Sequence, residues 1–484
     1  MAFGALAVWL AIAAGLHFAV PRVQALIRDH AAAMLGDEFG RPVQIQSLQA
    51  SASFTRLHIV ARGIEIGGLA RIETADAQTG ILPWHVRSVV LDGLSVRLTQ
   101  NSNPATAAKH AIAIDEVTVR DASVQILEVR LQLASLRLRD FDPRHASAFS
   151  ASVLMPQPQT IIAAQGRIGP WKNEDPTLTP VDATYAVQNS NLATVPGLSG
   201  TLSSRGRIRG ALRRPRITGD AAISAFGLGA GGRGQPVQAQ FDAAVDVSDG
   251  TAAIETLHGS LADSSFNANG TVRNIEDDSR REMDFQVSIP QGRLQDVLPL
   301  AVKSKTSPLS GALQARAMVS VLPGAQDILK RIYIAAAFTA ADARFASLDL
   351  RERLRALSRK AKGRPQDPSA GSSRLTMEGS VEVADGVARF SKLNLQLEGS
   401  SASLRGSYQL GSESLDFTGE AELEAKLSQT ATGAKAALLK LVQPFFRSRT
   451  GGARLPVRIT GTREDPQFGL SLATKVAEAG RAVR

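Results

Sequence analysis

The dominant pattern along this chain is the alternation of apolar and polar residues with a period of two. Strand-like runs follow one another from Val43 nearly to the end, separated by Gly, Asp, Asn or Pro. In the clearest run, Leu415–Leu427, the residues Leu415, Phe417 and Leu423 share one parity and charged residues occupy the other. Half-buried antiparallel strands require this arrangement. The chain is therefore predicted to be mainly β.

Helical patterns are few. A short amphipathic helix is expected after Pro21, with an apolar stripe at Val23, Ile27, Ala31 and Leu35, ending near the following glycines. Further helices are expected at Arg293–Lys303, Ala325–Ile332, Leu350–Lys362 and Thr432–Phe446. These are too few to cover a long sheet, so its apolar face must meet another sheet or something that is not protein.

An internal repeat predicts how the strands are arranged. Val245–Val272 aligns without gaps on Val381–Tyr408, and each copy reads strand, Asp-Gly turn, strand, polar turn, strand. Such meanders stack side by side into an elongated sheet. Between them, Arg351–Arg374 is basic, then rich in Pro, Gly and Ser, and is expected to be a solvated insertion.

A second repeated phrase reads R-I-x-G, four residues, then Pro. It occurs in Arg207–Gly219 and again in Leu455–Leu472. Glycine relaxes the backbone at the turn, and Pro215 and Pro466 preset φ for the strand that leaves it. Both copies are predicted to be hairpins and not ligand-binding loops.

The N-terminal segment Ala2–Val20 is apolar apart from His17. As a helix it spans about 28 Å, close to the thickness of a bilayer core. An uncleaved membrane anchor is preferred to a signal peptide or a buried helix, because no clean cleavage site follows. The expected membrane-facing residues are Phe3, Leu6, Val8, Trp9, Leu10, Ile12, Leu16, Phe18 and Val20.

Composition narrows the classes of function. The chain has 484 residues, 44% of them apolar and 21% charged, which is typical of a folded protein. It has no cysteine, which excludes disulfides, thiolate zinc sites and cysteine nucleophiles. The net charge of +10 suits an anionic membrane surface as well as nucleic acid. The densest arginine cluster, Arg205–Arg216, contains no stacking aromatic, so we expect no nucleic-acid partner.

None of the candidate nucleotide-binding, metal-binding or catalytic motifs has the sequence context that its function requires. The glycine-rich stretch Gly227–Gly232 precedes a strand, whereas a dinucleotide site needs a helix there. The seven histidines have no metal-ligand spacing, and no G-x-S-x-G elbow occurs. The acidic pairs in Asn173–Pro176 and Arg463–Pro466 are turn formers first. We expect no enzyme activity, no cofactor and no metal.

Two stretches resemble the AsmA-like family, which includes TamB and YhdP. Leu35–Gly68 is similar to the family's entry, with a "GRPV" phrase before a first strand pair. Phe417–Leu472 is similar to its C-terminal region, with a P-F-F turn and a "P-V-x-I-x-G-T" strand pair. The resemblance implies a bacterial inner-membrane protein with one membrane pass and a periplasmic body. It also implies a curved sheet with an apolar groove, phospholipid transfer toward the outer membrane, and a role in outer-membrane homeostasis.

The topology that this resemblance implies conflicts with one rule. Arg22 and Arg28 follow the apolar segment and no basic residue precedes it, which by the positive-inside rule places the body in the cytoplasm. A basic leader ahead of Met1 would reconcile the two.

The predicted fold is thus an elongated, curved, mostly antiparallel sheet, groove-like or partly closed, with an N-terminal transmembrane helix and a few short helices. Its expected parts are an anchor (1–21), an N-terminal β region (22–190), a central repeated β region (191–345), the basic insertion (346–373) and a C-terminal region (374–484).

The expected ligands are phospholipids, and the expected partners are the inner membrane and outer-membrane or assembly proteins. The alternative function is a scaffold that aids outer-membrane protein biogenesis by strand pairing. A closed sandwich core is the alternative to an open groove. The predicted lipid-binding residues are Leu375, Met377, Val381, Val383, Phe390, Leu393, Leu395, Leu397, Leu415, Phe417, Leu423 and Leu427.

Overall fold

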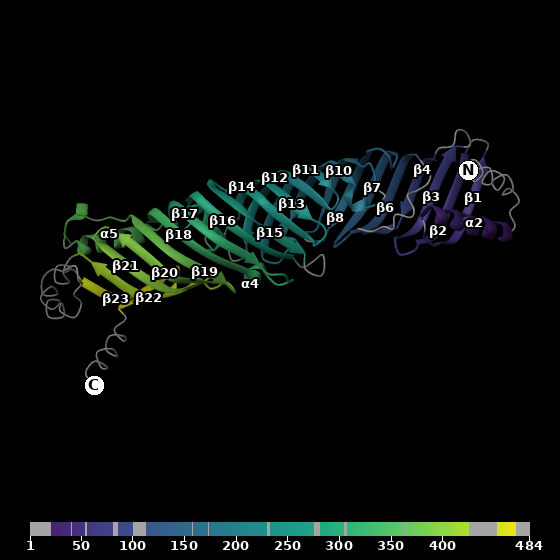
Figure 1. The fold of residues 1–484 in the computed structure, drawn as a ribbon. Coiled ribbons are helices and arrows are strands. Elements are labelled where there is room, and N and C mark those ends of the chain that lie inside the picture. The colour runs from purple at the N-terminus through teal and green to yellow at the C-terminus, as the bar shows by residue number, and fades with distance from the viewer. Residues whose placement is uncertain are drawn as a thin grey trace.

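One continuous sheet of 24 strands makes up most of the part of the protein that is described in this computed structural model. Figure 1 shows it as a long, twisted and curved ribbon with its two ends far apart. The structure describes residues 21–39, 41–53, 56–80, 86–99, 113–156, 158–172, 174–229, 233–274, 281–303, 307–362, 364, 366–370, 372–424 and 453–470. The prediction of a mainly β, elongated fold is confirmed.

The strands follow one another along the chain with short turns between most of them. They are β1 (Val43–Ser53), β2 (Arg56–Ile66), β3 (Ala70–Gly80), β4 (Val86–Asp92), β5 (Ser95–Leu98), β6 (Ile114–Ile126), β7 (Val129–Phe141), β8 (Ser147–Met155), β9 (Thr160–Ile168), β10 (Pro180–Asn191), β11 (Leu198–Ala211), β12 (Arg214–Leu228), β13 (Gln235–Asp246), β14 (Thr251–Leu261), β15 (Ser264–Asn274), β16 (Arg281–Arg293), β17 (Leu309–Val321), β18 (Ile332–Phe345), β19 (Leu375–Ala384), β20 (Val387–Leu397), β21 (Ser400–Gln409), β22 (Ser414–Leu423), β23 (Ala453–Thr462) and β24 (Pro466–Leu470).

The described helices are short, apart from those near the two ends of the sheet. They are α2 (Pro21–Phe39), η3 (Pro176–Leu178), η4 (Leu192–Thr194), α3 (Leu294–Val297), η5 (Leu298–Leu300), α4 (Ile328–Arg331), α5 (Leu348–Ala361) and η6 (Pro368–Ala370).

The topology is a meander with one irregularity. β3 pairs with both β4 and β5, and these two short strands both run parallel to β6. Every other pairing is antiparallel and joins strands that are consecutive in sequence, from β1–β2 to β23–β24. The sheet crosses every expected boundary between β regions without a break.

The internal repeat is confirmed down to its irregularities. The Asp-Gly turns precede β14 and β20, which occupy equivalent positions in the two copies. The register of β14 against β15 shifts between Ile254 and Leu257, and that of β20 against β21 shifts between Phe390 and Leu393. These are the same positions in the alignment, so the repeat preserves its β-bulge.

The repeated R-I-x-G phrase forms two equivalent hairpins. Gly210 lies opposite Pro215 between β11 and β12, and Gly461 lies opposite Pro466 between β23 and β24. Both glycines have a positive φ, +122° and +92°, which side chains rarely adopt. The hairpin prediction is confirmed.

The helix predictions are partly confirmed. The Arg293–Lys303 segment contains α3 and η5, the Ala325–Ile332 segment contains the single turn α4, and α5 lies where Leu350–Lys362 was expected. The first helix was expected to end at Gly36 and Gly40; α2 continues past Gly36 and ends at Phe39, directly before Gly40. The Thr432–Phe446 prediction lies outside the described residues.

The predicted membrane anchor, Ala2–Val20, also lies outside the described residues. Among the helices that the structure describes, none combines the length and the apolar character needed to cross a membrane.

The sheet has two chemically different faces and two long rims. The inner face carries the apolar residues of the alternation, and the outer face carries the polar ones. The first rim contains the turns β6–β7, β8–β9, β10–β11 and onward in steps of two strands. The second rim contains the turns β7–β8, β9–β10, β11–β12 and onward.

Candidate functional site: the apolar interior of the curled sheet

The predicted lipid-binding residues share one face of the sheet. The register places Leu375 opposite Leu397 and Met377 opposite Leu395 between β19 and β20. Directly opposed residues point to the same side of a sheet. The pairings of β20 with β21 and of β21 with β22 therefore place Phe417 on the same face as these residues. Every described member of the predicted set lies on the inner face. Leu427 and the anchor residues lie outside the described part of the chain.

Burial divides this set in two. Five members are buried, each with at most 8% of its surface exposed: Leu375, Met377, Leu397, Phe417 and Leu423. The remaining described members, Val381, Val383, Phe390, Leu393, Leu395 and Leu415, are half-buried. The first group packs largely against protein, whereas the second is accessible from the interior of the sheet.

The central strands continue the inner face and were not singled out from the sequence. Register places the following half-buried residues on it: Phe149, Ile162, Tyr185, Ile208, Ile217, Ile223, Val237, Phe241 and Leu257. Apart from the short η4 (Leu192–Thr194), which lies against β11 at the first rim, no described helix or second sheet packs extensively over β8–β13. The same period-two alternation marks these strands in the sequence, but nothing in it distinguishes them from the C-terminal strands.

Inner-face aromatic residues in mid-strand lie opposite glycines. A Cβ on Gly206 would come within 2.7 Å of Cε1 of Tyr185, and one on Gly406 within 2.9 Å of Cδ1 of Phe417. Each ring therefore occupies the space above its glycine partner, an arrangement known to stabilise glycine in sheets. The register pairs are Phe149–Gly166, Tyr185–Gly206, Phe241–Gly219, Phe266–Gly259, Phe285–Gly270, Phe338–Gly379, Phe390–Gly406 and Phe417–Gly406.

The sheet curls until its two rims touch, and we call the line of contact the seam. At the first contact the backbone N–H of Glu128, in the β6–β7 turn, donates to the carbonyl of Val247 after β13, at 3.3 Å. Leu98, Ile126 and Val247 form a buried cluster there. Because Ile126 lies on the inner face, the interior is apolar where the seam closes.

A second contact lies further along the seam. The N–H of Ile328, in α4 between β17 and β18, donates to the carbonyl of Pro196 before β11, at 2.9 Å. Asp327 approaches Gly197 so closely that a Cβ there would lie 2.5 Å from its Oδ1. At both contacts, a turn on the first rim meets a turn seven strands further along the second rim.

A strap, Leu294–Lys303, crosses the inner face from the first rim to the second. It begins where β16 ends, and Leu294 packs with Leu375 and Met377 in one buried cluster. Its last residue, Lys303, reaches the β21–β22 turn on the opposite rim. Leu309 on the first rim is only six positions after Lys303, so the rims are within about 22 Å of each other here. The strap explains why this part of the predicted set is buried.

The strap is held at both ends. At the first rim, buried Ser264 donates from Oγ to Oδ2 of buried Asp296 at 2.7 Å. At the second, the N–H of Lys303 donates to Oε1 of Glu413 at 2.8 Å, and its Nζ donates to the carbonyl of Gly411 at 2.9 Å.

Glu413 is the centre of the second attachment. Burial opposes its ionisation, but hydrogen bonds from the Arg463 side chain and from the backbone of Lys303 outweigh this and lower its pKa. Burial, with the charge of Glu413, raises the pKa of neighbouring Tyr408 to about 12.

Helices cover the two ends of the inner face. Ile27 and Ala31 of α2 pack on β1 and β2, as the predicted stripe requires, whereas Leu35 is 36% exposed. At the other end Ala361 of α5 packs against Leu423.

The expectation that the basic segment is a solvated insertion is wrong for α5. Ser358 and Ala361 are fully buried, and Oγ of Ser358 donates to the carbonyl of Glu398 at 2.6 Å. This contact was not predicted, because Ser358 and Ala361 stand among basic residues. Small residues such as Ser and Ala also add little to the apolar periodicity of a helix.

The outer face is polar and its arginines pair with acids. Arg207 contacts Asp182 and Arg216 contacts Asp242, each at 2.7 Å. The hydrogen bond from Arg207 lowers the pKa of the Asp182 carboxyl. Arginines already paired with carboxylates are poorly placed to neutralise phosphates, so this cluster favours a stabilised sheet face over a nucleic-acid surface.

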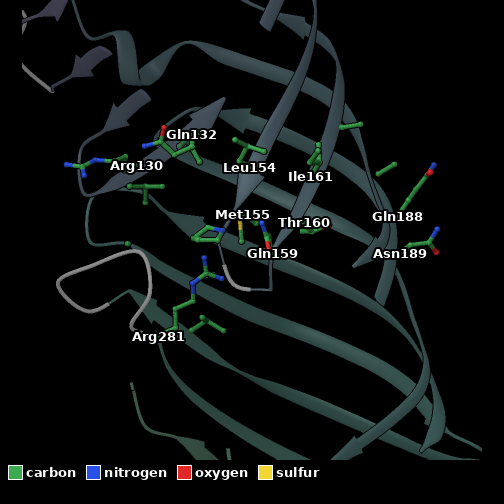
Figure 2. Close-up of a pocket in the computed structure, with 18 residues that line it drawn as sticks. Arg130, Gln132, Leu154, Met155, Gln159, Thr160, Ile161, Gln188, Asn189 and Arg281 are labelled. Atoms are coloured by element: carbon green, nitrogen blue, oxygen red, sulfur yellow. The ribbon is translucent and has the colours of Figure 1, made fainter. Parts of the chain in front are cut away.

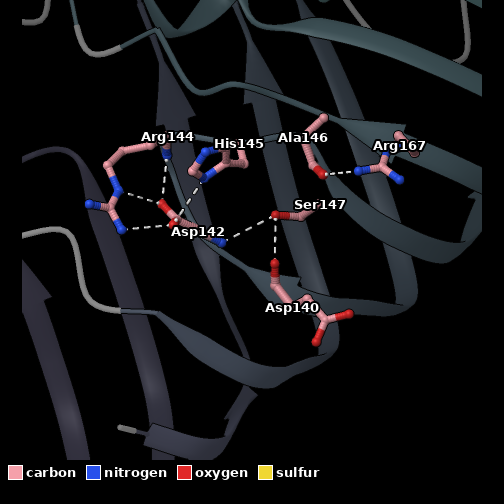
Figure 3. A network of polar contacts seen from close by, with 7 residues as sticks. All are labelled: Asp140, Asp142, Arg144, His145, Ala146, Ser147 and Arg167. Carbon is pink, nitrogen blue, oxygen red and sulfur yellow. Dashed lines mark hydrogen bonds and ion pairs between the residues drawn. The ribbon is translucent and has the colours of Figure 1, made fainter. Parts of the chain in front are cut away.

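One rim network contains the residue types of a catalytic triad but not its geometry. Figure 3 shows Asp142 held by Arg144 and by Nδ1 of His145, at 3.1 Å. The hydrogen bonds from Arg144 hold the pKa of Asp142 well below its usual range. Oγ of buried Ser147 instead accepts from the backbone N–H of Asp142 and donates to the carbonyl of Asp140. The network fastens the β7–β8 turn.

Other expected chemistry has the following outcome. β12 runs into β13 across the glycine-rich stretch, so the strand that was expected after it is confirmed. Among the described residues, no three His, Asp or Glu side chains gather as metal ligands would.

In comparison with known proteins, no family model, no curated protein and no solved structure matches this chain.

Proposed function

We propose that this protein binds and transfers phospholipids, with their acyl chains held along the inner face of the curled sheet. The observation that carries the proposal is the continuous, half-buried apolar surface of β8–β13, which no described helix or second sheet covers apart from the short η4 at its rim. A large accessible apolar surface is usually a binding site for a partner or a lipid. The rims partly enclose this surface, which favours thin apolar chains over a folded partner.

The energetics of this surface suit transfer. Each acyl methylene that leaves water gains about 0.8 kcal/mol, so a long chain is held firmly in total. The gain is the same at each strand, because Ile208, Ile217, Ile223 and Val237 repeat similar chemistry. Ladder hydrogen bonds satisfy the backbone beneath, so the backbone of these strands offers no free polar group that would fix a chain in one place.

The location belongs to the same proposal. The apolar segment Ala2–Val20 would anchor the chain in a bacterial inner membrane, with the sheet extending through the periplasm toward the outer membrane. The length of the sheet in Figure 1 supports a role that spans a distance. The resemblance of Leu35–Gly68 and Phe417–Leu472 to AsmA-like proteins supports it as well.

An assembly function is the second candidate, and one observation favours it. β24 pairs with β23 alone among the described strands, so no described strand lies beside its other edge. Phe468 on β24 is 65% exposed. Such an edge is a template for an added strand from a partner.

The proposed function is tested on the full chain purified in mild detergent. Native mass spectrometry and lipid extraction are expected to show bound phospholipid. Ile223→Asp on the inner face should reduce bound lipid with the circular dichroism spectrum unchanged. The neighbouring outer-face change Ala222→Asp is the matched control and should keep the lipid. Absence of lipid from the wild-type chain, together with no uptake from phospholipid vesicles, contradicts the proposal. Unfolding by Ile223→Asp would instead indicate a closed core.

A further inference from the structure

A cavity of about 1160 Å³ opens in the seam between its first two contacts. On one side it is bounded by the ends of β7 to β10 on the first rim, including Met155 and Thr160 around the β8–β9 turn. On the other side it is bounded by the second rim, where Ala252, Val272 and Arg281 line it. Figure 2 shows the residues of both rims converging on this space. Contacts between the rims close the seam on either side of this cavity.

The lining shows that this cavity passes through the wall of the sheet. Val129 and Leu131 belong to the inner face, since they oppose Ile126 and Val124. Leu154 and Ile161, which also line the cavity, have the opposite parity and belong to the outer face. A cavity lined by both faces connects the interior with the outside. We call it the portal.

The outer end of the portal is apolar on a face that is otherwise polar. Leu154 and Ile161 lie directly opposite each other on β8 and β9, and are 42% and 55% exposed. The adjoining outer-face positions on these strands are Ser152 and Ala163. A pair of large exposed apolar residues beside an opening gives an apolar chain a continuous path from outside to Leu131 inside.

Two cations also line the portal, one from each rim. Arg130 follows the β6–β7 turn and is exposed, and it makes no ion pair with any residue that the structure describes. Arg281 begins β16 on the opposite rim and already has an interaction of its own. None of the 18 described lining residues is acidic.

Amide side chains complete the polar part of the lining. Gln132, Gln159, Gln188 and Asn189 are all exposed and can donate hydrogen bonds to oxygen. Arginine forks and amide donors together recognise phosphate oxygens. The portal therefore combines apolar residues for a chain with donors for an anionic head.

We infer that the portal is the site where a phosphate-bearing lipid of net negative charge enters or leaves the interior sideways. Its head contacts Arg130 and the amide side chains, with Arg281 on the facing rim, while its chains pass Leu154 and Ile161 to the inner face. This inference rests on the proposed function, because it needs lipid inside the sheet. It adds that loading takes place through the seam between the rim contacts, and that it favours anionic lipids.

The first experiment locates lipid by photocrosslinking. The chain has no cysteine, so single cysteines can be placed at will and labelled with a benzophenone maleimide. The positions are Ile161→Cys in the portal, Ile223→Cys on the inner face and Ala222→Cys on the outer face. Each labelled full-length chain is mixed with phosphatidylglycerol vesicles and irradiated, and adducts are measured by mass spectrometry.

Each outcome of this experiment decides something. Adducts at both Ile161→Cys and Ile223→Cys, and none at Ala222→Cys, support the portal. An adduct at Ile223→Cys without one at Ile161→Cys overturns the portal and leaves the proposed function standing. No adduct at either position contradicts the proposed function as well. Equal labelling at all three positions means non-specific contact and overturns the portal.

The second experiment tests the preference for anionic lipid. The variant Arg130→Glu/Arg281→Glu is compared with Arg139→Glu/Arg405→Glu, which makes the same charge change at exposed outer-face positions away from the portal. Initial uptake of fluorescent phosphatidylglycerol from vesicles is expected to fall about tenfold in the portal variant only, as the loss of charge-assisted hydrogen bonds predicts. Uptake of phosphatidylcholine should change less than about twofold. An equal loss for both lipids, or in both variants, overturns the inference.

Discussion

The portal region and the strapped region use the same sheet but close it by different means. Around the portal the rims meet through turns, with single backbone hydrogen bonds such as Glu128 to Val247 and Ile328 to Pro196. Under the strap, protein crosses the inner face and packs on it, so that Leu375 and Met377 are buried. Alternation on the strands is equally regular in both regions.

The difference shows that the strand pattern alone does not decide whether an apolar face becomes a packed core or stays uncovered by protein. What decides it is the chain that connects the strands. Between β16 and β17 the connection is long and apolar, with Leu294, Val297 and Leu298 on it, and it covers the face. Between β8 and β9 the connection is short and covers nothing.

The largest expected effect contrasts one aliphatic truncation in each region. Leu375→Ala should lower the free energy of unfolding by about 2–4 kcal/mol, because the cavity forms in a packed cluster. Ile223→Ala should cost less than about 1.5 kcal/mol, because that side chain already faces the interior. Urea denaturation followed by circular dichroism measures both. Equal losses would mean that the central face is also a packed core.

The next effect concerns the strap's attachment to the first rim. Asp296→Ala removes the buried acceptor of Ser264 and should lower the free energy of unfolding by about 1–3 kcal/mol. Hydrogen exchange should become faster in Leu294–Lys303. Asp263→Ala is the control on the same rim, because its side chain is 67% exposed in its ion pair with Arg293. If both variants behaved alike, the strap would not be fastened through Asp296.

A smaller and pH-dependent effect is expected at the other end of the strap. The pKa of Glu413 is lower in the folded chain than its usual value near 4.5. Its ionised form is therefore favoured by folding, and this stabilisation is complete above that value and is lost as the pH falls through the folded pKa. Glu413→Gln should cost about 1 kcal/mol at pH 7, and the difference from wild type should shrink below pH 4.5.

The control for this prediction contacts the same arginine. Glu464 also pairs with Arg463, but its side chain is 79% exposed. Glu464→Gln should leave stability unchanged from pH 7 to 4 in the same titration, since exposed ion pairs contribute little. A pH dependence equal to that of Glu413→Gln would mean that Lys303 plays no part in the effect.

The smallest effect is expected on the outer face, which both regions share. Arg207→Ala removes an exposed ion pair with Asp182 and should leave the melting temperature within experimental error. High salt should have equally little effect on the wild type. A marked loss of stability would mean that the paired outer face, and not the interior, holds the sheet in its curl.

The strands and their inner face were predicted well from the sequence. The alternation shows which residues of a strand share a face, and the turn residues show where the hairpins lie. The parity of Leu375, Leu395 and Phe417 and the Gly210 and Gly461 hairpins were all visible in advance. Local rules were sufficient, since each strand pairs mainly with its neighbours in the chain.

The seam, the strap and the portal could not be predicted, because they depend on how far the sheet curls. The contact of Glu128 with Val247 joins residues whose separation in sequence is large and whose own patterns are unremarkable turns. Curl accumulates over many strands from twist and bulges, and no single run of residues encodes it. Leu154 and Ile161 likewise look like ordinary strand residues until the opposite rim is placed beside them.

The constant separation along the seam has a consequence for how such a protein changes in length. Because a turn meets its partner seven strands further on at both contacts between turns, the circumference depends on twist per strand and not on the total number of strands. Adding or removing hairpins would then lengthen or shorten the molecule at constant width. The duplicated meander, Val245–Val272 and Val381–Tyr408, is a unit that could be added or removed in this way. A chain of this kind can match the distance between two surfaces by gene duplication alone, without redesigning its cross-section.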